Sequence, residues 1–193
     1  MLVIGLTGVA GSGKSTVADH LIEKYSFARG KFAGALKAMF RTFLRYRGAD
    51  DALIERMVEG DLKETPSALL NGRTPRHAMI ELGHTWGRER MDLDLWVDTE
   101  AAALSNRRLP FVVFDDVRYP NEVDAIYRLG GEIWRVSRTV EDMRPRPGAH
   151  VSEALDVVPD RKLYNCASRA ELFAVVEMNV LAAKRRHASK VAA

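Results

Sequence analysis

Two kinds of hydrophobic pattern alternate along the chain. Short apolar runs at Leu2–Thr7 and at 109–114 (LPFVVF) are typical of buried strands, and the second run ends in two aspartates. Between and after these runs, apolar residues recur at three- and four-residue spacing, which is typical of amphipathic helices. Strands that alternate with helices predict a parallel sheet with helices on both faces.

The same pattern gives approximate bounds for the other elements. Further strands are expected at 28–33, 132–137 and 162–164, and helices at 17–25, 36–44, 51–58, 74–90, 94–104, 121–129 and 169–186. Thr74 and Pro75 fit a helix N-cap followed by proline at the first helical position. The arginine- and proline-rich stretch at 138–151 has little to bury and predicts a surface loop.

A glycine-rich loop follows the first strand. GVAGSGKS, which begins at Gly8, fits the pattern G-x-x-x-x-G-K-[ST] and stands between a predicted strand and a predicted helix. Such glycines let successive backbone N–H groups point at a phosphate, and the helix N-terminus adds partial positive charge. Lys14 is expected to reach the β and γ phosphates, and the Ser15 hydroxyl to ligate Mg²⁺. The predicted triphosphate-binding residues are Gly8, Ala10, Gly11, Ser12, Gly13, Lys14, Ser15 and Thr16.

Charged side chains follow the LPFVVF strand. Asp115 and Asp116 would lie at the carboxyl edge of a parallel sheet, beside the glycine-rich loop, so one of them is expected to hold Mg²⁺ through water. The alternative is a pair of aspartates that caps the next turn. Arg118 would lie at the same edge, where a guanidinium is suited to clamp an acceptor phosphate.

Composition excludes several classes of protein. The 193 residues are 47% hydrophobic with a net charge of +3, which fits one substantial core and argues against a nucleic-acid partner. The single cysteine excludes an internal disulfide and argues against a Cys-based zinc site. No apolar run approaches the roughly 20 residues of a membrane span. We therefore expect a soluble, cytoplasmic protein with no membrane partner.

Six stretches together resemble one family. They are GLTGVAGSGKST, KFAGALK, TPRHAMIELGHTWGRERMDLDLW, VFDDVRYPNEVDAI, HVSE and LYNCASRAEL. The chain resembles the phage-type deoxynucleoside monophosphate kinases of the P-loop kinase superfamily, which are related to dephospho-CoA kinase. TPR followed by GxxWGR and DVRxxNE carries the resemblance most specifically. It implies Mg²⁺-dependent transfer of the ATP γ-phosphate to the 5′-phosphate of a deoxynucleotide.

The resemblance also implies roles on the acceptor side. Four cations fall at motif positions that face the monophosphate, namely Lys37, Arg76, Arg88 and Arg118. For each of them the alternative is a solvated side chain that pairs with a nearby carboxylate. Trp86 would stack on the acceptor base or belong to the core. Glu122 would bind the acceptor or, together with Asn121, cap a helix.

A lid at about 138–153 is implied as well. Arg138 is expected to touch the transferring phosphate and to act in catalysis with Lys14, Arg118 and Asp116, and Arg144 and Arg146 are further lid candidates. Asn165 would lie near the adenine or simply form a turn.

These expectations combine into one prediction. We expect a three-layer α/β P-loop NTPase fold with a parallel five-stranded sheet in the order 2-3-1-4-5. A single domain would cover 1–187, with an acceptor-binding insertion at about 34–106 and a disordered tail at 188–193. The protein would be a monomer or homodimer, in the host cytoplasm if its gene is a phage gene. Two alternatives are a kinase of another small metabolite, similar to dephospho-CoA kinase, and a P-loop ATPase or switch without an acceptor.

Overall fold

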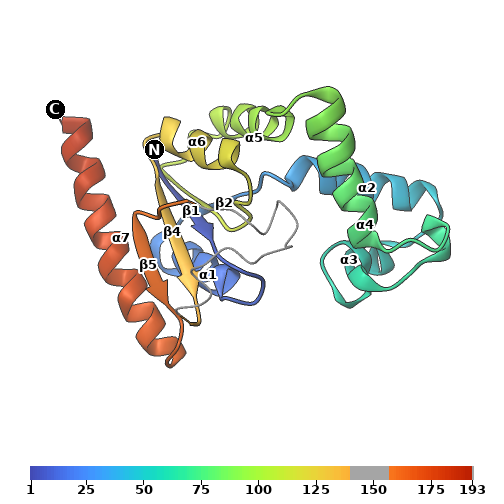
Figure 1. Ribbon diagram of the computed structural model, residues 1–193. Helices are drawn as coiled ribbons and strands as arrows, with labels where there is room; N and C mark the ends of the chain where they lie inside the picture. Colours follow the sequence, from blue (N-terminus) through green and yellow to red (C-terminus); the bar gives the residue numbers. More distant parts are fainter. Residues whose placement is uncertain (140–156, 193) are drawn as a thin grey trace. The chain divides into compact units, whose positions relative to one another are not determined.

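A computed structural model describes residues 1–139 and 157–192 of the chain (Figure 1). The chain divides into two compact units. The sheet unit comprises Met1–Lys31 and Leu104–Ala193, and the inserted unit comprises Phe32–Ala103. The inserted unit has nearly the extent of the predicted insertion at 34–106; its acceptor-binding role stays a prediction.

The sheet unit is built on five parallel strands in the order β2-β3-β1-β4-β5, as predicted. The central strand β1 has its side chains buried on both faces, which explains why its sequence is an unbroken apolar run. The three-layer α/β P-loop fold is therefore confirmed. The strands are β1 (Leu2–Thr7), β2 (Ala28–Gly30), β3 (Phe111–Phe114), β4 (Glu132–Ser137) and β5 (Arg161–Tyr164).

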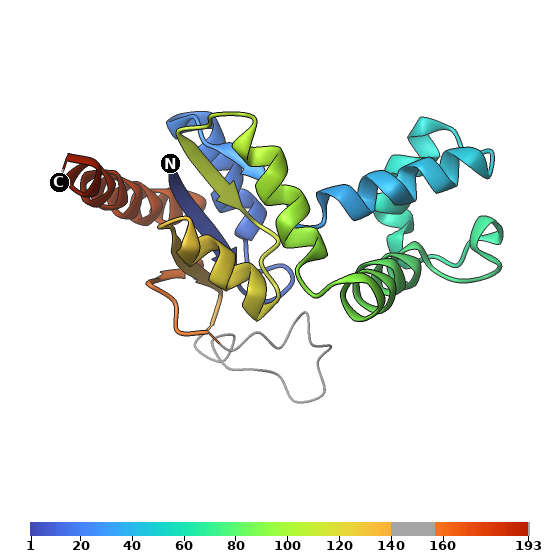
Figure 2. The same ribbon diagram turned by 90° about the horizontal axis from the view of Figure 1, so that it is seen from above.

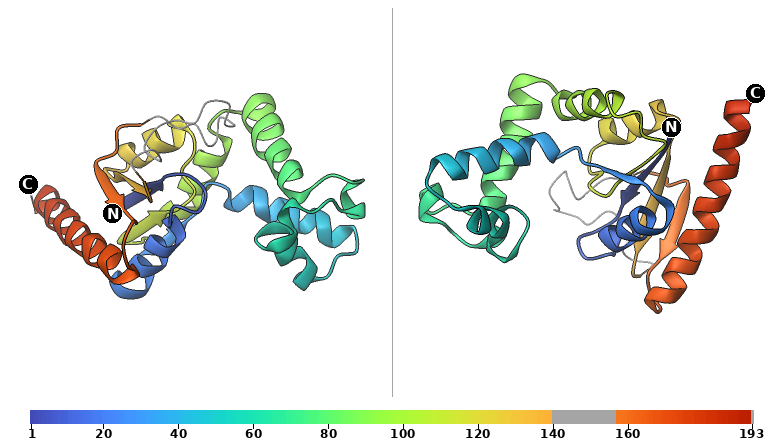
Figure 3. Two further views of the ribbon diagram at one scale, coloured as in Figure 1. Left: turned by 60° about the horizontal axis from the view of Figure 1, so that its bottom comes forward. Right: turned by 180° about the vertical axis from the view of Figure 1, so that it is seen from behind.

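Helices cover both faces of this sheet (Figure 3). Ile4 and Leu6 of β1 belong to one core cluster with residues of α1 (Lys14–Tyr25) and α7 (Arg169–Ala192). On the opposite face, Gly5 lies against Ile126 of α6 (Pro120–Arg128), where an added Cβ would come within 2.3 Å of the Ile126 Cδ1. Alternate residues of β1 thus serve opposite layers, as the two-residue period of a strand requires.

The inserted unit is helical and has its own core (Figure 2). Leu36 and Phe40 pack with Met79 and Trp96 in that core. Its elements are α2 (Gly34–Tyr46), α3 (Asp51–Val58), η1 (Asp61–Glu64), η2 (Ala68–Leu70), α4 (Pro75–Ile80), η3 (Glu81–Met91) and most of α5 (Leu95–Ser105). Thr74 caps α4 as predicted, because its Oγ1 accepts a hydrogen bond from the His77 N–H at 3.1 Å.

Two helices differ from the sequence expectation. The single helix expected at 74–90 is α4 followed by η3, which is a π-helix of 11 residues. The final helix α7 continues to Ala192 instead of ending near 186. The extension contains alanine and lysine and no proline or glycine, so nothing in it opposes helix formation. Each described helix is too short or too polar to span a bilayer.

Candidate functional site

The loop between β1 and α1 depends on its glycines. Gly8, Gly11 and Gly13 have positive φ angles of 136°, 76° and 110°, in the region that favours glycine. A Cβ on Gly8 would lie 2.2 Å from the Val136 carbonyl oxygen, and one on Gly13 would lie 2.5 Å from the Asn165 Nδ2. The loop is therefore held closely against β4 and the segment after β5, and no larger residue fits at these two positions.

Asn165 holds the loop in place. Its Nδ2 donates to the Ser12 carbonyl oxygen at 2.9 Å, and its own backbone N–H donates to the Ser137 carbonyl oxygen at 2.7 Å. The Ser12 N–H donates in turn to the Val9 carbonyl oxygen at 3.2 Å, which closes a tight turn. Asn165 thus positions the glycine-rich loop; its predicted contact with adenine stays a prediction.

The start of α1 is suited to an anion. Its N-cap, Gly13, makes no side-chain cap, and the first turn contains no acidic residue. The first N–H groups of a helix have no acceptor within the helix, so they point out at the loop with partial positive charge. Lys14 Nζ donates to the carbonyl oxygens of Gly8 at 2.7 Å and Val9 at 2.8 Å. Donors and a cation around a glycine cradle are the chemistry that a triphosphate needs.

Asp115 lies at the carboxyl end of β3 and is buried, with a side chain that is 3% exposed. Its carboxylate lies 3.3 Å from Arg29 Nη1 and 3.1 Å from Lys31 Nζ. Asp116, the next residue, is less buried, and Ser15 is exposed. The hydroxyl of Ser15 and the two carboxylates are oxygen donors of the kind Mg²⁺ prefers, and Mg²⁺ takes few protein ligands when it also binds phosphates.

The sequence interpretation missed Arg29 and Lys31. Their place follows from strand register, because Gly30 of β2 is paired with Phe114 of β3. Lys31, which follows β2, therefore meets Asp115, which follows β3, and Arg29 lies within β2 next to Gly30. A single sequence does not give that register, and the short β2 strand has only a weak hydrophobic signal.

Glu122 serves the backbone at the start of α6. Its side chain is buried, and its Oε2 accepts hydrogen bonds from the N–H groups of Arg118 at 2.6 Å and Tyr119 at 3.1 Å. These bonds favour helix capping over acceptor binding for Glu122. The Arg118 side chain is exposed and forms no ion pair with a carboxylate in the part of the chain that the structure describes.

Arg138 follows directly after β4 and is exposed. Arg135 lies within β4, buried and opposite Thr7 of β1, so it belongs to the sheet. Beyond Thr139, the predicted lid with Arg144 and Arg146 lies outside the described residues.

Four predicted acceptor residues lie in the inserted unit. Lys37 donates to both oxygens of the Glu59 carboxylate, at 2.8 and 2.9 Å, and Arg76 pairs with Glu64. Arg88 Nη1 donates to the Gly83 carbonyl oxygen at 3.0 Å. The remaining residue, Trp86, is 39% exposed, with its ring centroid 6.1 Å from that of Trp96.

Comparison with known proteins identifies the family to which the chain belongs. No model of a known protein family matches the chain. A protein of Acanthamoeba polyphaga mimivirus that carries the provisional name deoxynucleotide monophosphate kinase is 34% identical over 152 residues, which cover 72% of this chain and 75% of that protein.

Solved structures support the fold alone. TT1252 from Thermus thermophilus has a TM-score of 0.52 at 22% identity, over 94% of this chain and 96% of that one. An unliganded sugar kinase from Janibacter sp. has a TM-score of 0.39 at 15% identity, too low to carry an argument. By its similarity to the mimivirus protein, the chain belongs to the deoxynucleoside monophosphate kinase family of P-loop kinases and is a phosphotransferase.

Proposed function

We propose that the protein transfers the γ-phosphate of ATP to the 5′-phosphate of a deoxynucleoside monophosphate, giving ADP and the diphosphate, with Mg²⁺. One observation on this chain supports the proposal in addition to its family. The glycine-rich loop follows β1 and Arg118 follows β3, and these strands are parallel neighbours in the sheet. A triphosphate cradle and a guanidinium without an ion pair among the described residues therefore share one sheet edge.

On the donor side, the chain's own residues hold and neutralise phosphate. The backbone N–H groups of the loop and Lys14 bind the β and γ phosphates of ATP, of which only the γ-phosphate is transferred. Ser15 and Asp116 would hold Mg²⁺, which would neutralise negative charge on the phosphates. We assign this role to Asp116 because Arg29 and Lys31 already neutralise Asp115. Asp115 then fixes β2 beside β3 instead of binding metal.

On the acceptor side, arginines bind the monophosphate. Arg118 of the sheet unit has an exposed side chain for this purpose. Within the inserted unit, the family resemblance assigns the acceptor to Lys37, Arg76, Arg88 and Trp86. Lys37 and Arg76 each pair with a carboxylate, and a surface ion pair contributes at most about 1 kcal/mol, so giving up that partner would cost little. Arg138 neutralises the transferring group while the lid excludes water.

An acceptor panel tests the proposal. The purified chain is assayed for ADP release with ATP and Mg²⁺, using the four deoxynucleoside monophosphates, the four ribonucleotides and dephospho-CoA as acceptors. We expect release that depends on a deoxynucleoside monophosphate. Release with dephospho-CoA alone, or release that no acceptor changes, would refute the proposal.

A further inference from the structure

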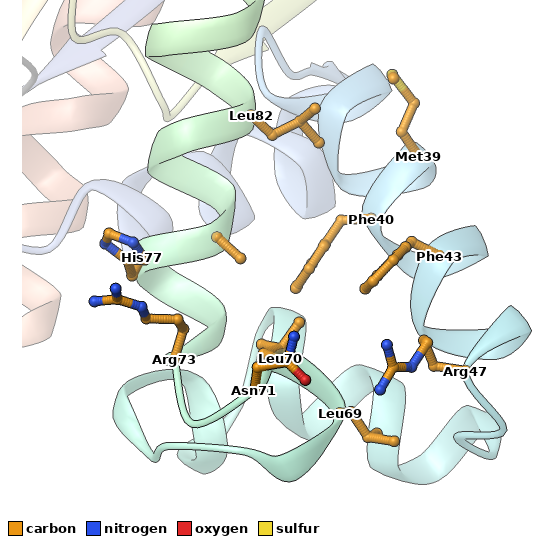
Figure 4. A pocket seen from close by; sticks show the side chains of 11 residues that line it. Met39, Phe40, Phe43, Arg47, Leu69, Leu70, Asn71, Arg73, His77 and Leu82 are labelled. Carbon is orange, nitrogen blue, oxygen red and sulfur yellow. The ribbon is translucent and has the colours of Figure 1, made fainter.

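The inserted unit contains a pocket of about 410 Å³ that none of the predicted acceptor residues lines (Figure 4). Side chains of α2, η2, α4 and η3 and of the residues after α2 and η2 form it. Its walls are mostly apolar, with Phe40, Phe43 and Leu70 among them. Small-molecule sites in proteins have volumes of about 300–1,000 Å³, apolar walls and a few polar groups. The pocket therefore has the size of a metabolite site.

The aromatic wall is partly uncovered. Phe40 is buried, but Phe43 is 45% exposed and Met39 is 43% exposed. The Phe40 and Phe43 rings are inclined by only 10°, with centroids 6.4 Å apart. An aromatic wall with a partly exposed Phe43 ring suits a flat, apolar body such as a nucleobase, because bases stack on aromatic side chains.

The rim of the pocket is cationic. Arg47 and Arg73 pair with no carboxylate within the described residues. By contrast, Lys37, Arg41 and Arg45, on a neighbouring side of α2, each pair with an acidic side chain. Acidic side chains thus neutralise Lys37, Arg41 and Arg45. No acidic residue is among the described residues that line the pocket. Charge complementarity favours an anionic ligand.

The backbone of the loop that carries Asn71 and Arg73 is held by hydrogen bonds. The Ser67 N–H donates to the Arg73 carbonyl oxygen at 3.1 Å, and the Gly72 N–H donates to the Ser67 carbonyl oxygen at 2.9 Å. This closed loop fixes Asn71, whose φ is 51°, beside Leu70. In Figure 4, Arg73 lies next to His77 at one side of the pocket, and Arg47 lies on the side of Phe43. The backbone that carries Asn71 and Arg73 is therefore fixed by hydrogen bonds before a ligand binds.

The pocket is separate from the predicted acceptor cation on the same helix. Ala78 of α4 lines the pocket, and Arg76 lies two positions earlier, which is about 200° around a helix. Arg76 pairs with Glu64 on that other side. Arg76 is therefore not one of the side chains that line the pocket.

We propose that this pocket is a second nucleotide site, which binds a nucleoside phosphate with its base on Phe40 and Phe43 and its phosphate on Arg73 and His77. Arg47 and Asn71 face the edge of the base, since arginine and asparagine are side chains that hydrogen-bond base edges. The site does not rest on the proposed reaction, because none of its residues takes part in phosphoryl transfer.

The methyl group of Met39 reports on the pocket directly. The full chain is labelled with ¹³C at its methionine methyl groups, the Met39 signal is assigned with Met39→Leu, and each deoxynucleoside monophosphate is titrated, with deoxynucleosides and inorganic phosphate as separate probes. We expect a saturable shift of the Met39 signal with at least one nucleotide, weaker with its nucleoside and absent with phosphate. Arg73→Ala should weaken that nucleotide's affinity about tenfold, the loss of one charge-assisted contact.

Arg45→Ala is the matched control, because Arg45 is an exposed α2 cation that pairs with Asp51. It should leave the affinity unchanged, and both variants should unfold at the wild-type temperature. Three results would each overturn the proposal. The first is no change in the Met39 chemical shift up to about 1 mM nucleotide, and the second is a nucleotide affinity that Arg73→Ala leaves unchanged. The third is a Met39 chemical shift that changes with protein concentration, as it would if the pocket were an interface between two copies of the chain.

Discussion

At the scale of single residues, the glycine-rich loop is held from two sides. Lys14 donates to the carbonyl oxygens of Gly8 and Val9 from within, and Asn165 donates to that of Ser12 from the segment after β5. The first contact uses a charge that the proposed reaction needs, and the second sets only the shape of the loop. Removal of Lys14 should therefore change mainly kcat, and removal of Asn165 mainly KM for ATP.

Lys14→Ala removes the cation from the phosphate cradle. We expect kcat to fall at least about 100-fold, which corresponds to about 2.7 kcal/mol of transition-state stabilisation. Steady-state kinetics with saturating ATP measure it. Lys24→Ala, at the last turn of the same helix, removes a lysine that pairs with Glu177 and should keep wild-type turnover. Wild-type turnover in Lys14→Ala would disprove its role.

Asn165→Ala removes one hydrogen bond to the loop. Such a bond contributes about 1 kcal/mol, so KM for ATP should rise about fivefold while kcat changes little. Asn179→Ala is the matched control, because Asn179 Nδ2 donates to the Val175 carbonyl oxygen at 2.8 Å within α7, in an equivalent bond. Equal kinetic effects of the two substitutions would show that Asn165 does not position the loop.

At the scale of elements, the π-helix η3 is the feature that local pattern did not predict. The spacing of apolar residues correctly predicts helical structure from Thr74 onward, but it does not predict the wider turns of η3, which contacts Trp96 of α5. Trp96 is buried, and its Nε1 donates to the Gly83 carbonyl oxygen at 2.8 Å. Gly87 lies against the same indole ring. π-helices are rare, and the three- and four-residue spacing of apolar residues does not predict them.

Gly87→Ala tests that contact. An added Cβ would lie 2.5 Å from the Trp96 Nε1, so the buried indole ring must move. We expect a loss of about 1–3 kcal/mol in the free energy of unfolding, measured by urea denaturation. Gly83→Ala should cost less, because its Cβ meets only the Leu36 Cδ2 at 3.1 Å. If Gly87→Ala were the milder variant, the packing of η3 on Trp96 would not be what stabilises this helix.

At the scale of the whole molecule, the sequence predicted the fold but not the ion pairs between distant residues. The glycine-rich loop and most helices and strands follow from patterns that lie within short stretches, and the strand order follows from the resemblance to the P-loop kinases. The ion pairs of Lys37 with Glu59 and of Asp115 with Arg29 and Lys31 join residues far apart in sequence. Their partners depend on strand register and helix packing, which a single sequence leaves open.

The folded protein should become less stable as the pH is lowered. Hydrogen bonds from Lys24 to Glu177 and from Arg41 to Glu55 lower the pKa of both carboxyl groups below their ordinary value of 4.5. A lowered folded-state pKa contributes stability above the unfolded pKa that is lost as pH falls through the folded one. The melting temperature should therefore decline below pH 4.5, and less steeply in Glu177→Gln. An unchanged slope in that variant would contradict the assignment.

The fate of the γ-phosphate tests the proposed reaction most directly. The chain is incubated with Mg²⁺, a deoxynucleoside monophosphate and ATP labelled with ³²P at the γ position, and the products are separated by chromatography. We expect the label in the β-phosphate of the deoxynucleoside diphosphate, with none of it formed by Lys14→Ala. Label found only in inorganic phosphate would mean that the protein hydrolyses ATP and is not a monophosphate kinase.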